Sequence, residues 1–318
     1  MEQGKYYIVS FLDSFEFPLR EATRKEVWWE AEQRRDEGCD VTVFIAEAPR
    51  NELVKEKDGI KLTAINPKQI PTLRADVVHC LTGSVSIWLP LFRKVKAKKK
   101  ILTLTDGWML ANSRIWLRKL VLRRAFKYFD TVEVYSEYQK RIINDDRVLI
   151  VKPHLPKLNI PDVEKAERPT VLYMGHISKS KGFDAIIPAM RRLLSENPDV
   201  RFVVANNMIQ GDGEYLDMVK ALVNDFPEQV ITKGVVNPLE ELKKAWVYIY
   251  PFNTPMGTMA FALSLYEAEQ CGTPFVACNV GGNAEFFDAK YLIEPGNENQ
   301  LYDKIVFFIN ERKNTTNL

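Results

Sequence analysis

The chain has 318 residues, 46% of them hydrophobic, and a formal charge of +2, which together predict a folded protein of about two domains of ~150 residues each. No apolar run reaches the ~18 residues of a membrane-spanning helix, and the first residues lack the basic flank and apolar core of a signal peptide. The four cysteines are scattered without a CxxC pair, which indicates buried thiols in a reducing cytoplasm rather than disulfides or a zinc site.

The charge is distributed unevenly along the chain. The segment 93–127 contains twelve Lys and Arg residues but one acid, Asp106, so it carries +11, and the remainder of the chain carries −9. A block this basic favours a polyanionic partner such as an anionic membrane surface, a nucleic acid or an acidic acceptor.

In the first half of the chain, short apolar runs alternate with segments of helical periodicity. The predicted strands are Tyr6–Leu12, Val41–Ala46, Val77–Leu81, Ile101–Thr105 and Thr131–Tyr135. The predicted helices are Arg24–Glu37, Ser86–Val95 and Arg114–Tyr128. This alternation is typical of a parallel sheet covered by helices on both faces.

A proline-rich stretch then interrupts the alternation, which resumes after it. The stretch predicts a linker over 156–169, between an N-terminal domain over 1–155 and a C-terminal domain over 170–318. The predicted strands of the second domain are Val171–Met174, Phe202–Ala205, Val230–Thr232, Val247–Tyr250 and Phe275–Ala277. Its predicted helices are Phe183–Glu196, Glu214–Asn224, Pro238–Ala245, Met259–Gln270 and Asn299–Arg312. We therefore expect an α/β protein with two doubly wound, Rossmann-like domains.

The segment Met259–Ala277 (MAFALSLYEAEQCGTPFVA) resembles the donor-binding segment of GT-B glycosyltransferases of the retaining group 1 or family 4 type, which reads EGFGLPxxEAxAxGxPVVA. Glu267 matches the second glutamate, and the resemblance implies that it binds the ribose hydroxyls of a nucleotide sugar. Met259 replaces the first glutamate, so the sugar-hydroxyl contact made there must be absent or supplied elsewhere. The residues that could supply it are Asn253, Thr254 and Thr258.

A second motif runs from Gly175 to Gly182 (GHISKSKG) and resembles the family pattern GRxxxxKG. A glycine turn that leads into a helix N-terminus presents backbone N–H groups to a diphosphate. The resemblance implies that Lys181 binds the diphosphate and that His176 stands in place of an arginine. Because histidine donates at most two hydrogen bonds and is charged only part of the time near neutral pH, we expect a weaker or more pH-sensitive diphosphate site.

Two further turns complete the predicted donor site. Gly281 and Gly282 resemble the GGxxE turn of the family, in which backbone amides approach the phosphate or sugar. Val235 and Val236 follow Gly234 as in the family's G-x-V turn, which holds the base through main-chain groups. This last turn is interpreted equally well as an ordinary strand-to-helix loop.

The resemblance is looser in the first domain. Thr105 and Asp106 end the predicted strand where the family usually reads T-x-H-D, so Thr105 replaces a histidine that lies beside the reacting sugar. Asp106 is either functional or a counter-charge within the basic block. Asp13 and Ser14 follow the first strand and are expected on the acceptor side. The predicted catalytic residues are Asp106, Thr105 and Lys181.

The resemblance implies transfer of a sugar from a nucleoside diphosphate sugar to an acceptor, with retention of configuration and without a metal or other cofactor. None of the three histidines has metal-ligand spacing. The basic block favours a membrane-associated or polyanionic acceptor, including a modified base in DNA, and a cytoplasmic protein that attaches peripherally to the inner face of a membrane. The substitutions at Met259, His176 and Thr105 also fit an inactive GT-B-like binding subunit. A sugar epimerase is disfavoured because its catalytic groups are not visible.

Overall fold

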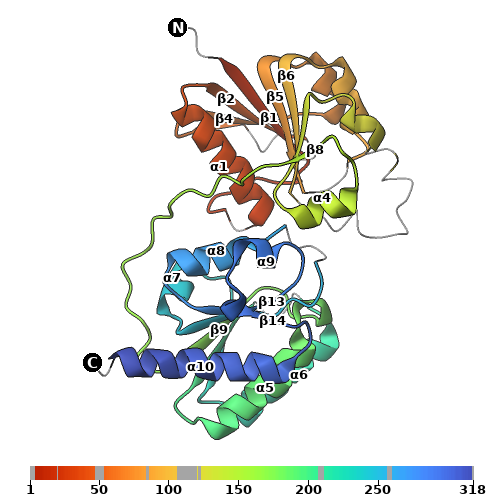
Figure 1. Cartoon of the computed structure of the whole chain (residues 1–318). Coiled ribbons are helices and arrows are strands. Elements are labelled where there is room, and N and C mark those ends of the chain that lie inside the picture. Colours follow the sequence, from red (N-terminus) through yellow and green to blue (C-terminus); the bar gives the residue numbers. More distant parts are fainter. Residues whose placement is uncertain are drawn as a thin grey trace. The chain divides into compact units, whose positions relative to one another are not determined.

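The computed structural model describes residues 4–19, 21–46, 54–83, 86–105, 120, 123–206, 211–255 and 260–316. The chain forms two compact units, the first built mainly from Met1–Pro156 and the second from Lys157–Pro255 and Phe261–Leu318. Each unit contains a sheet of parallel strands with helices packed against it (Figure 1). The expected pair of Rossmann-like α/β domains is confirmed.

In the first unit, eight described strands form one sheet in the order β3-β4-β2-β1-β5-β6-β7-β8. Their bounds are β1 Lys5–Ser10, β2 Asp40–Ile45, β3 Val54–Lys57, β4 Ile60–Ala64, β5 Arg74–Thr82, β6 Lys96–Leu104, β7 Thr131–Val134 and β8 Val148–Ile150. All neighbours are parallel except β3, which runs antiparallel to β4. The strand order reverses between β1 and β5, which makes the gap beside their carboxyl ends a topological switch point.

Helix α1 (Ala22–Asp36) packs buried apolar side chains against one face of this sheet, and a second hydrophobic cluster lies on the other face. The shorter helices are α4 (Glu137–Ile143) and the 3-10 helices η1 (Pro67–Thr72) and η2 (Leu89–Lys94). Side chains alternate between the two faces along each strand. Val78 of β5 and Leu102 of β6 therefore enter the core, whereas His79 and Thr103 lie on the α1 side.

A buried polar network occupies the α1 side of the sheet. The ring nitrogens of His79 lie 2.9 Å from the Tyr6 hydroxyl and 2.8 Å from Oγ1 of Thr103. The Tyr6 hydroxyl donates to Glu30 of α1 at 3.1 Å. Burial alone would raise the pKa of Glu30, but His79 and Arg34 together lower it to about 2. His79 therefore has a structural role in fixing α1 to the sheet.

Three features of this unit differ from the predictions made from the sequence or fall on residues that the structure does not describe. The helix predicted over Ser86–Val95 is only the 3-10 helix η2, because Pro90 would be an interior residue of the predicted helix, where it has no N–H to donate, and it stands instead in the first turn of η2. Most of the helix predicted over Arg114–Tyr128 lies outside the described residues. The hairpin of β3 and β4 was not predicted, although Asp58 and Gly59 have the positive φ angles, 53° and 76°, that two-residue hairpin turns require.

In the second unit, six described strands form a parallel sheet in the order β11-β10-β9-β12-β13-β14. Their bounds are β9 Thr170–Met174, β10 Arg201–Ala205, β11 Val230–Lys233, β12 Val247–Tyr250, β13 Phe275–Cys278 and β14 Leu292–Ile293. The strand order reverses between β9 and β12. Ligands of such sheets bind beside the carboxyl ends of the strands at this switch point.

Helices lie on both sides of this second sheet, with α5, α6 and α10 on one side and α7 and α8 on the other (Figure 1). The helices are α5 Phe183–Glu196, α6 Gly213–Asp225, α7 Pro238–Lys244, α8 Leu263–Gln270, α9 Asn283–Phe286 and α10 Glu298–Thr316, with the 3-10 helices η4 Lys179–Lys181 and η5 Ala289–Tyr291. Helix α5 has the predicted bounds. The helix predicted from Met259 is wrong in its first turn, because residues 260–262 are buried but not helical and α8 begins at Leu263.

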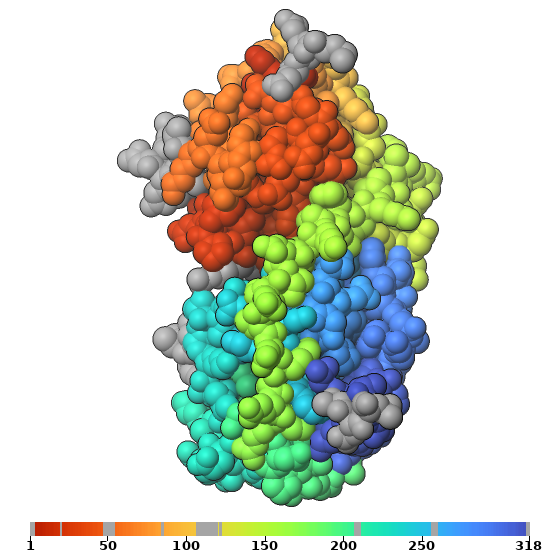
Figure 2. All heavy atoms as spheres, turned by 90° about the vertical axis from the view of Figure 1, so that its left-hand side faces the viewer, coloured from red at the N-terminus to blue at the C-terminus, as the bar shows by residue number. Residues whose placement is uncertain are grey.

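The segment before β9 has no regular secondary structure and runs along the surface of the second unit (Figure 2). The Lys165 ammonium donates to the Ala245 carbonyl at 2.6 Å and to Thr273 Oγ1 at 2.5 Å. Burial, together with the nearby cations Arg312 and Lys243, lowers the pKa of Lys165 to about 8. Among the described residues, no helix is long and apolar enough to cross a membrane.

Candidate functional site

The loop after β9 carries the predicted diphosphate turn, and its backbone is fixed by hydrogen bonds. Gly175 has a φ of 133°, a conformation that favours glycine. Its carbonyl accepts a hydrogen bond from Nδ2 of Asn206 at 2.7 Å. The carbonyl of His176 accepts one from the Tyr173 hydroxyl at 2.5 Å. The side chain of His176 is exposed, so the imidazole lies at the surface of a rigid turn.

Asn206 is a site residue that the sequence analysis missed. Besides its bond to Gly175, its own backbone N–H donates to the carbonyl of Lys233 at 2.8 Å. Asn206 therefore joins the carboxyl ends of β9, β10 and β11. The signal that could have identified it is a polar residue directly after a buried strand, since such positions meet at the ligand-binding edge of a parallel sheet.

The turn that contains Lys181 packs closely against the segment that follows β12. Gly182 has a φ of 83°, and a Cβ atom added to it would lie 2.0 Å from the carbonyl oxygen of Pro251. The backbone N–H of Asn253 donates to Ser180 at 3.3 Å, and its side-chain amide donates to the Lys179 carbonyl at 2.9 Å. The carboxyl ends of the two switch-point strands are thus joined by direct contacts, and only glycine fits at position 182.

The Lys181 side chain lies in this junction on an aromatic surface. Its Nζ atom lies 3.8 Å from the centroid of the Phe252 ring, and Phe252 stacks on Tyr250 at a centroid distance of 3.7 Å. Burial lowers the pKa of Lys181 to about 8. An ammonium that has lost much of its hydration and faces an aromatic ring can pair strongly with an incoming phosphate.

The lowered pKa of Lys181 predicts a pH dependence of donor binding. A diphosphate binds the protonated amine and raises its pKa, so the free protein must take up a proton at pH values above about 8. We expect the dissociation constant for a nucleoside diphosphate to rise by about tenfold per pH unit above that pH, as the Lys181 amine loses its proton. Calorimetric titration between pH 6 and 10 measures this dependence. A dissociation constant that stays flat throughout would contradict a role for the Lys181 amine.

Helix α8 places Glu267 against the sheet. The Glu267 side chain is buried, with 4% of the residue exposed. The Tyr248 hydroxyl of β12 donates to Oγ of Ser264 on the same helix at 3.2 Å. Strand β12 therefore contacts both parts of the candidate site. Its residue Tyr248 bonds to α8, and the residues that follow the strand pack against the Lys181 turn.

The glycine turn after β13 supports the start of α8. Gly281 has a φ of 61°, which glycine adopts readily, and Gly282 precedes α9. Oδ1 of the buried Asn283 accepts a hydrogen bond from the backbone of Ala262 at 3.4 Å, and its amide donates to Cys278 at 3.0 Å. The glycine pair therefore lies beside the residue from which α8 starts.

The loop after β11 holds Val235 and Val236 at the same edge of the sheet. Val235 is 64% exposed, as single apolar residues at a protein surface often are, so a main-chain contact of this loop would leave its side chain in solvent. The loop is held by an ion pair of 2.6 Å between Lys233 and the buried Glu241 of α7. Two predicted site residues, Met259 and Asp106, lie outside the described residues, as does Thr258.

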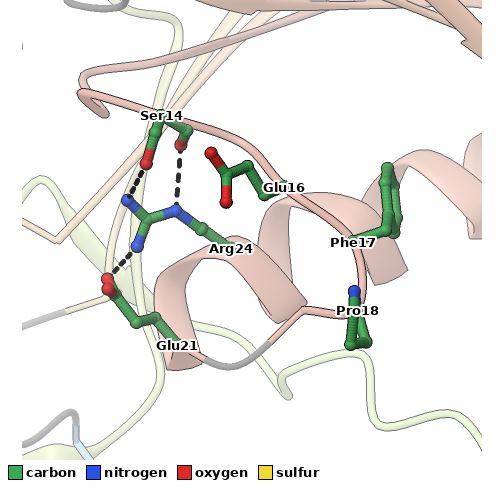
Figure 3. Close-up of a pocket in the computed structure, with 6 residues that line it drawn as sticks. All are labelled: Ser14, Glu16, Phe17, Pro18, Glu21 and Arg24. Carbon is green, nitrogen blue, oxygen red and sulfur yellow. Dashed lines mark hydrogen bonds and ion pairs between the residues drawn. The ribbon is translucent and has the colours of Figure 1, made fainter.

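In the first unit, the predicted acceptor-side residues Asp13 and Ser14 lie in the loop after β1, and Ser14 lines a hollow of about 190 Å³ (Figure 3). Arg24 of α1 holds this loop. It donates from Nε to the Ser14 carbonyl at 2.9 Å, and from a terminal nitrogen to Asp13 at 2.7 Å and to the Ser14 hydroxyl at 2.9 Å. It also pairs with Glu21. Arg24 was not predicted, and it fixes the position of both Asp13 and Ser14.

Thr105 lies at the carboxyl end of β6, where its backbone N–H donates to Thr82 at 3.0 Å. Its side chain is fully buried. Among the described residues, no group of three His, Cys, Asp or Glu side chains could hold a metal ion.

Comparisons with known proteins support the resemblance. Residues 158–318, half of the chain, match the family described as "Glycosyl transferases group 1". The "Putative glycosyltransferase YtcC" of Bacillus subtilis is 23% identical over 77% of this chain and 68% of its own length. A GDP-mannose-dependent alpha-(1-6)-phosphatidylinositol monomannoside mannosyltransferase of Mycolicibacterium smegmatis is 26% identical over 62% of this chain and 56% of its own length. The chain thus spans between about half and two thirds of these two relatives.

A solved structure, Anabaena Alr3699/HepE in complex with UDP, superposes with a TM-score of 0.69 over 97% of this chain and 90% of the other, at 14% identity. At that identity the likeness shows a shared fold.

Proposed function

The chain belongs to the group 1 glycosyltransferases and has their GT-B fold, and from this premise we propose that it transfers a sugar from a nucleoside diphosphate sugar to an acceptor with retention of configuration. The observation that carries the proposal is the Lys181 turn, which places a partly dehydrated ammonium at the switch point of the second sheet. HepE, which shares the fold, has been crystallised with UDP.

Each residue of the site has a role in this proposal. Lys181 and His176, with backbone amides of their turn, stabilise the charge of the departing nucleoside diphosphate. Because cationic side chains and amides neutralise that charge, the transfer needs no metal ion. Glu267 accepts hydrogen bonds from the ribose hydroxyls. The remaining proposed donor contacts are made by Gly175, Gly182, Val235, Val236, Met259, Gly281 and Gly282.

A thermal-shift screen of UDP-, GDP-, ADP- and dTDP-sugars tests the proposal. We expect one nucleotide class to raise the melting temperature, and we expect Glu267→Gln to reduce that rise. Product analysis by NMR then reports the anomeric configuration, which should be that of the donor. If no nucleotide sugar shifted the melting temperature, the chain would be a binding subunit without transferase activity.

We propose that the basic block attaches the protein to an anionic membrane surface. Its described N-terminal part lies at the amino end of β6, at the opposite edge of the sheet from Asp13, Ser14 and Thr105. Five of its cations are exposed, namely Arg93, Lys94, Lys96, Lys98 and Lys99. These residues can therefore contact an anionic surface without covering the predicted acceptor loop.

We expect replacement of Lys94, Lys96 and Lys99 by Gln to reduce co-sedimentation with phosphatidylserine vesicles by ~10-fold or more at low salt, since each cation near such a surface contributes ~1 kcal/mol. The matched control replaces three exposed lysines of the second unit, Lys157, Lys220 and Lys290. Equal losses of co-sedimentation in the two variants would contradict a membrane-binding surface confined to the basic block. Binding to duplex DNA but not to vesicles would assign the basic block to a nucleic-acid acceptor.

A further inference from the structure

The α1 side of the first sheet contains a hollow of about 620 Å³, a volume within the ~300–1,000 Å³ of typical small-molecule sites. Side chains of β5, β6 and β7 form its floor, and α1 and the segment 151–154 that follows β8 form its walls. All the described residues that line it belong to the first unit, and none of them is a predicted donor, acceptor or catalytic residue. The hollow is therefore separate from the candidate site.

The floor of this hollow is polar, whereas the faces of a parallel sheet are usually apolar because helices cover them. Three neighbouring strands place His79, Thr103 and Glu133 on the floor. An apolar helix packed over these groups would take them out of water without giving them hydrogen bonds, which is unfavourable. The floor is suited instead to a ligand that forms hydrogen bonds itself.

A chain of hydrogen bonds across the sheet holds Glu133 in place. The Nδ1 atom of His79 lies 3.3 Å from Glu30 of α1, and its Nε2 atom lies 2.8 Å from Oγ1 of Thr103. The Thr103 hydroxyl donates to Oε2 of Glu133 at 3.0 Å. Glu133 is only half-buried, and a carboxylate has about four acceptor sites. The network therefore presents a fixed carboxylate that can accept further hydrogen bonds inside the hollow.

The charges that line the hollow balance, with three carboxylates and three basic side chains. The carboxylates are Glu30, Glu37 and Glu133, and the basic side chains are Arg34, Lys99 and Lys152. Arg34 pairs with both Glu30 and Glu37 at 2.8 Å, whereas Lys99 and Lys152 are exposed. A phosphate would meet the carboxylates and an organic cation would meet the basic groups, so the lining favours an uncharged ligand. Hydroxyl groups both donate and accept hydrogen bonds, so a ligand rich in hydroxyls matches this mixture.

We propose that this hollow binds an uncharged carbohydrate. Glu133 accepts hydrogen bonds from the sugar hydroxyls, and the ammonium groups of Lys99 and Lys152 donate to them. Val77 and Ile101, which also line the hollow, contact the apolar C–H groups of the sugar ring. The inference goes beyond the proposed function and does not depend on it, because a chain without transferase activity could bind a carbohydrate here.

Calorimetric titration of the whole chain with disaccharides of glucose, galactose, mannose and N-acetylglucosamine tests the inference. We expect at least one disaccharide to bind, and we expect Glu133→Gln to raise its dissociation constant by ~10-fold, because a hydrogen bond to a charged acceptor is lost. Val77→Phe adds a ring to the floor and should abolish binding. Melting temperatures measured without sugar show whether each variant is folded.

A pair of surface lysines keeps the test decisive if a floor variant does not fold. Lys152 is exposed at the hollow, and Lys152→Gln should raise the dissociation constant by ~3-fold or more, because a charged donor is lost. Lys68 is an exposed lysine of η1 that does not line the hollow, and Lys68→Gln should leave the constant unchanged. Binding that is equally strong in the Lys152, Lys68 and unmodified proteins would overturn the inference, as would the absence of binding by every disaccharide.

The donor turn provides a further control. Lys181→Ala should leave the disaccharide dissociation constant unchanged, because Lys181 belongs to the second unit. Loss of disaccharide binding in this variant would assign the carbohydrate to the donor turn and overturn the inference. Failure of the proposed function would appear separately, as a protein that binds the disaccharide but no nucleotide sugar.

Discussion

Replacing Lys181 by alanine is expected to lower kcat/KM for the donor by ~100-fold or more. The variant removes a charge-assisted hydrogen bond to the diphosphate, and that bond acts in a partly dehydrated site where such bonds contribute most. Because the leaving group gains charge in the transition state, kcat should fall as well as the donor affinity. Steady-state kinetics with saturating acceptor, together with calorimetry of UDP binding, separate the two effects.

Lys179 provides a matched control for this variant. It belongs to the same turn and has the same charge, but its side chain is exposed, and its hydrogen bonds with the described residues Asp212 and Asn253 are made by its backbone. Lys179→Ala should therefore change kcat/KM by less than about threefold, as expected for a surface charge. Equal losses for the two lysines would mean that the turn contributes only a general positive field, and the specific role of Lys181 would be wrong.

Replacing Gly182 by alanine is expected to destabilise the second unit by ~2–5 kcal/mol, from the left-handed backbone and from the collision of the new Cβ with Pro251. The corresponding fall in melting temperature is ~5–15 °C for a unit of this size. Donor binding should be lost even below the transition, because Lys181 directly precedes this residue. Calorimetric unfolding and UDP titration at low temperature measure the two effects.

A control substitution at Gly272 separates the backbone strain from the collision of the added Cβ atom. It also has a positive φ, 65°, but an added Cβ atom would meet nothing within 4 Å. Gly272→Ala should therefore cost only the ~1–2 kcal/mol of backbone strain and leave UDP binding intact. If Gly182→Ala proved no more harmful than Gly272→Ala, the tight junction between Gly182 and Pro251 would be refuted.

Much of the fold could be predicted because the strands are buried and parallel, and such strands read as short apolar runs separated by helical periods. Helix α5 begins after a glycine and ends where its apolar period stops, so its bounds follow from local sequence. The errors arose where tertiary packing overrides the pattern. Ala260, Phe261 and Ala262 continue the apolar period of α8, yet Asn283 bonds the backbone of Ala262 and holds it outside the helix.

The candidate site was predictable where it depends on glycine turns and one lysine, since these have fixed spacings within a single segment. It was not predictable where it depends on contacts between distant segments. The Phe252 ring beneath Lys181 is separated from it by 71 positions, and no local pattern indicates that they meet. Oγ1 of Thr105 has no hydrogen-bond partner among the described residues, and this too could not be predicted, because a buried threonine hydroxyl usually finds a partner.

The arrangement of the candidate donor site follows from the topology of the second sheet. Strands β9 and β12 are neighbours in the sheet but lie far apart in the sequence, so their loops diverge on either side of the switch point. The contacts of Gly182 with Pro251 and of Asn253 with Lys179 connect these loops and hold Lys181 at that point. A nucleoside diphosphate placed there would meet Lys181, and α8 packs on the adjoining strand.

The central claim is that the second unit binds a nucleoside diphosphate sugar through Lys181 and Glu267. A crystal structure with UDP, or with whichever nucleotide gives the largest thermal shift, tests this claim most directly. We expect a diphosphate oxygen within hydrogen-bond distance of Lys181 Nζ and the ribose hydroxyls within hydrogen-bond distance of the Glu267 carboxylate. A nucleotide bound at any other place, with both side chains free of contact, would contradict it.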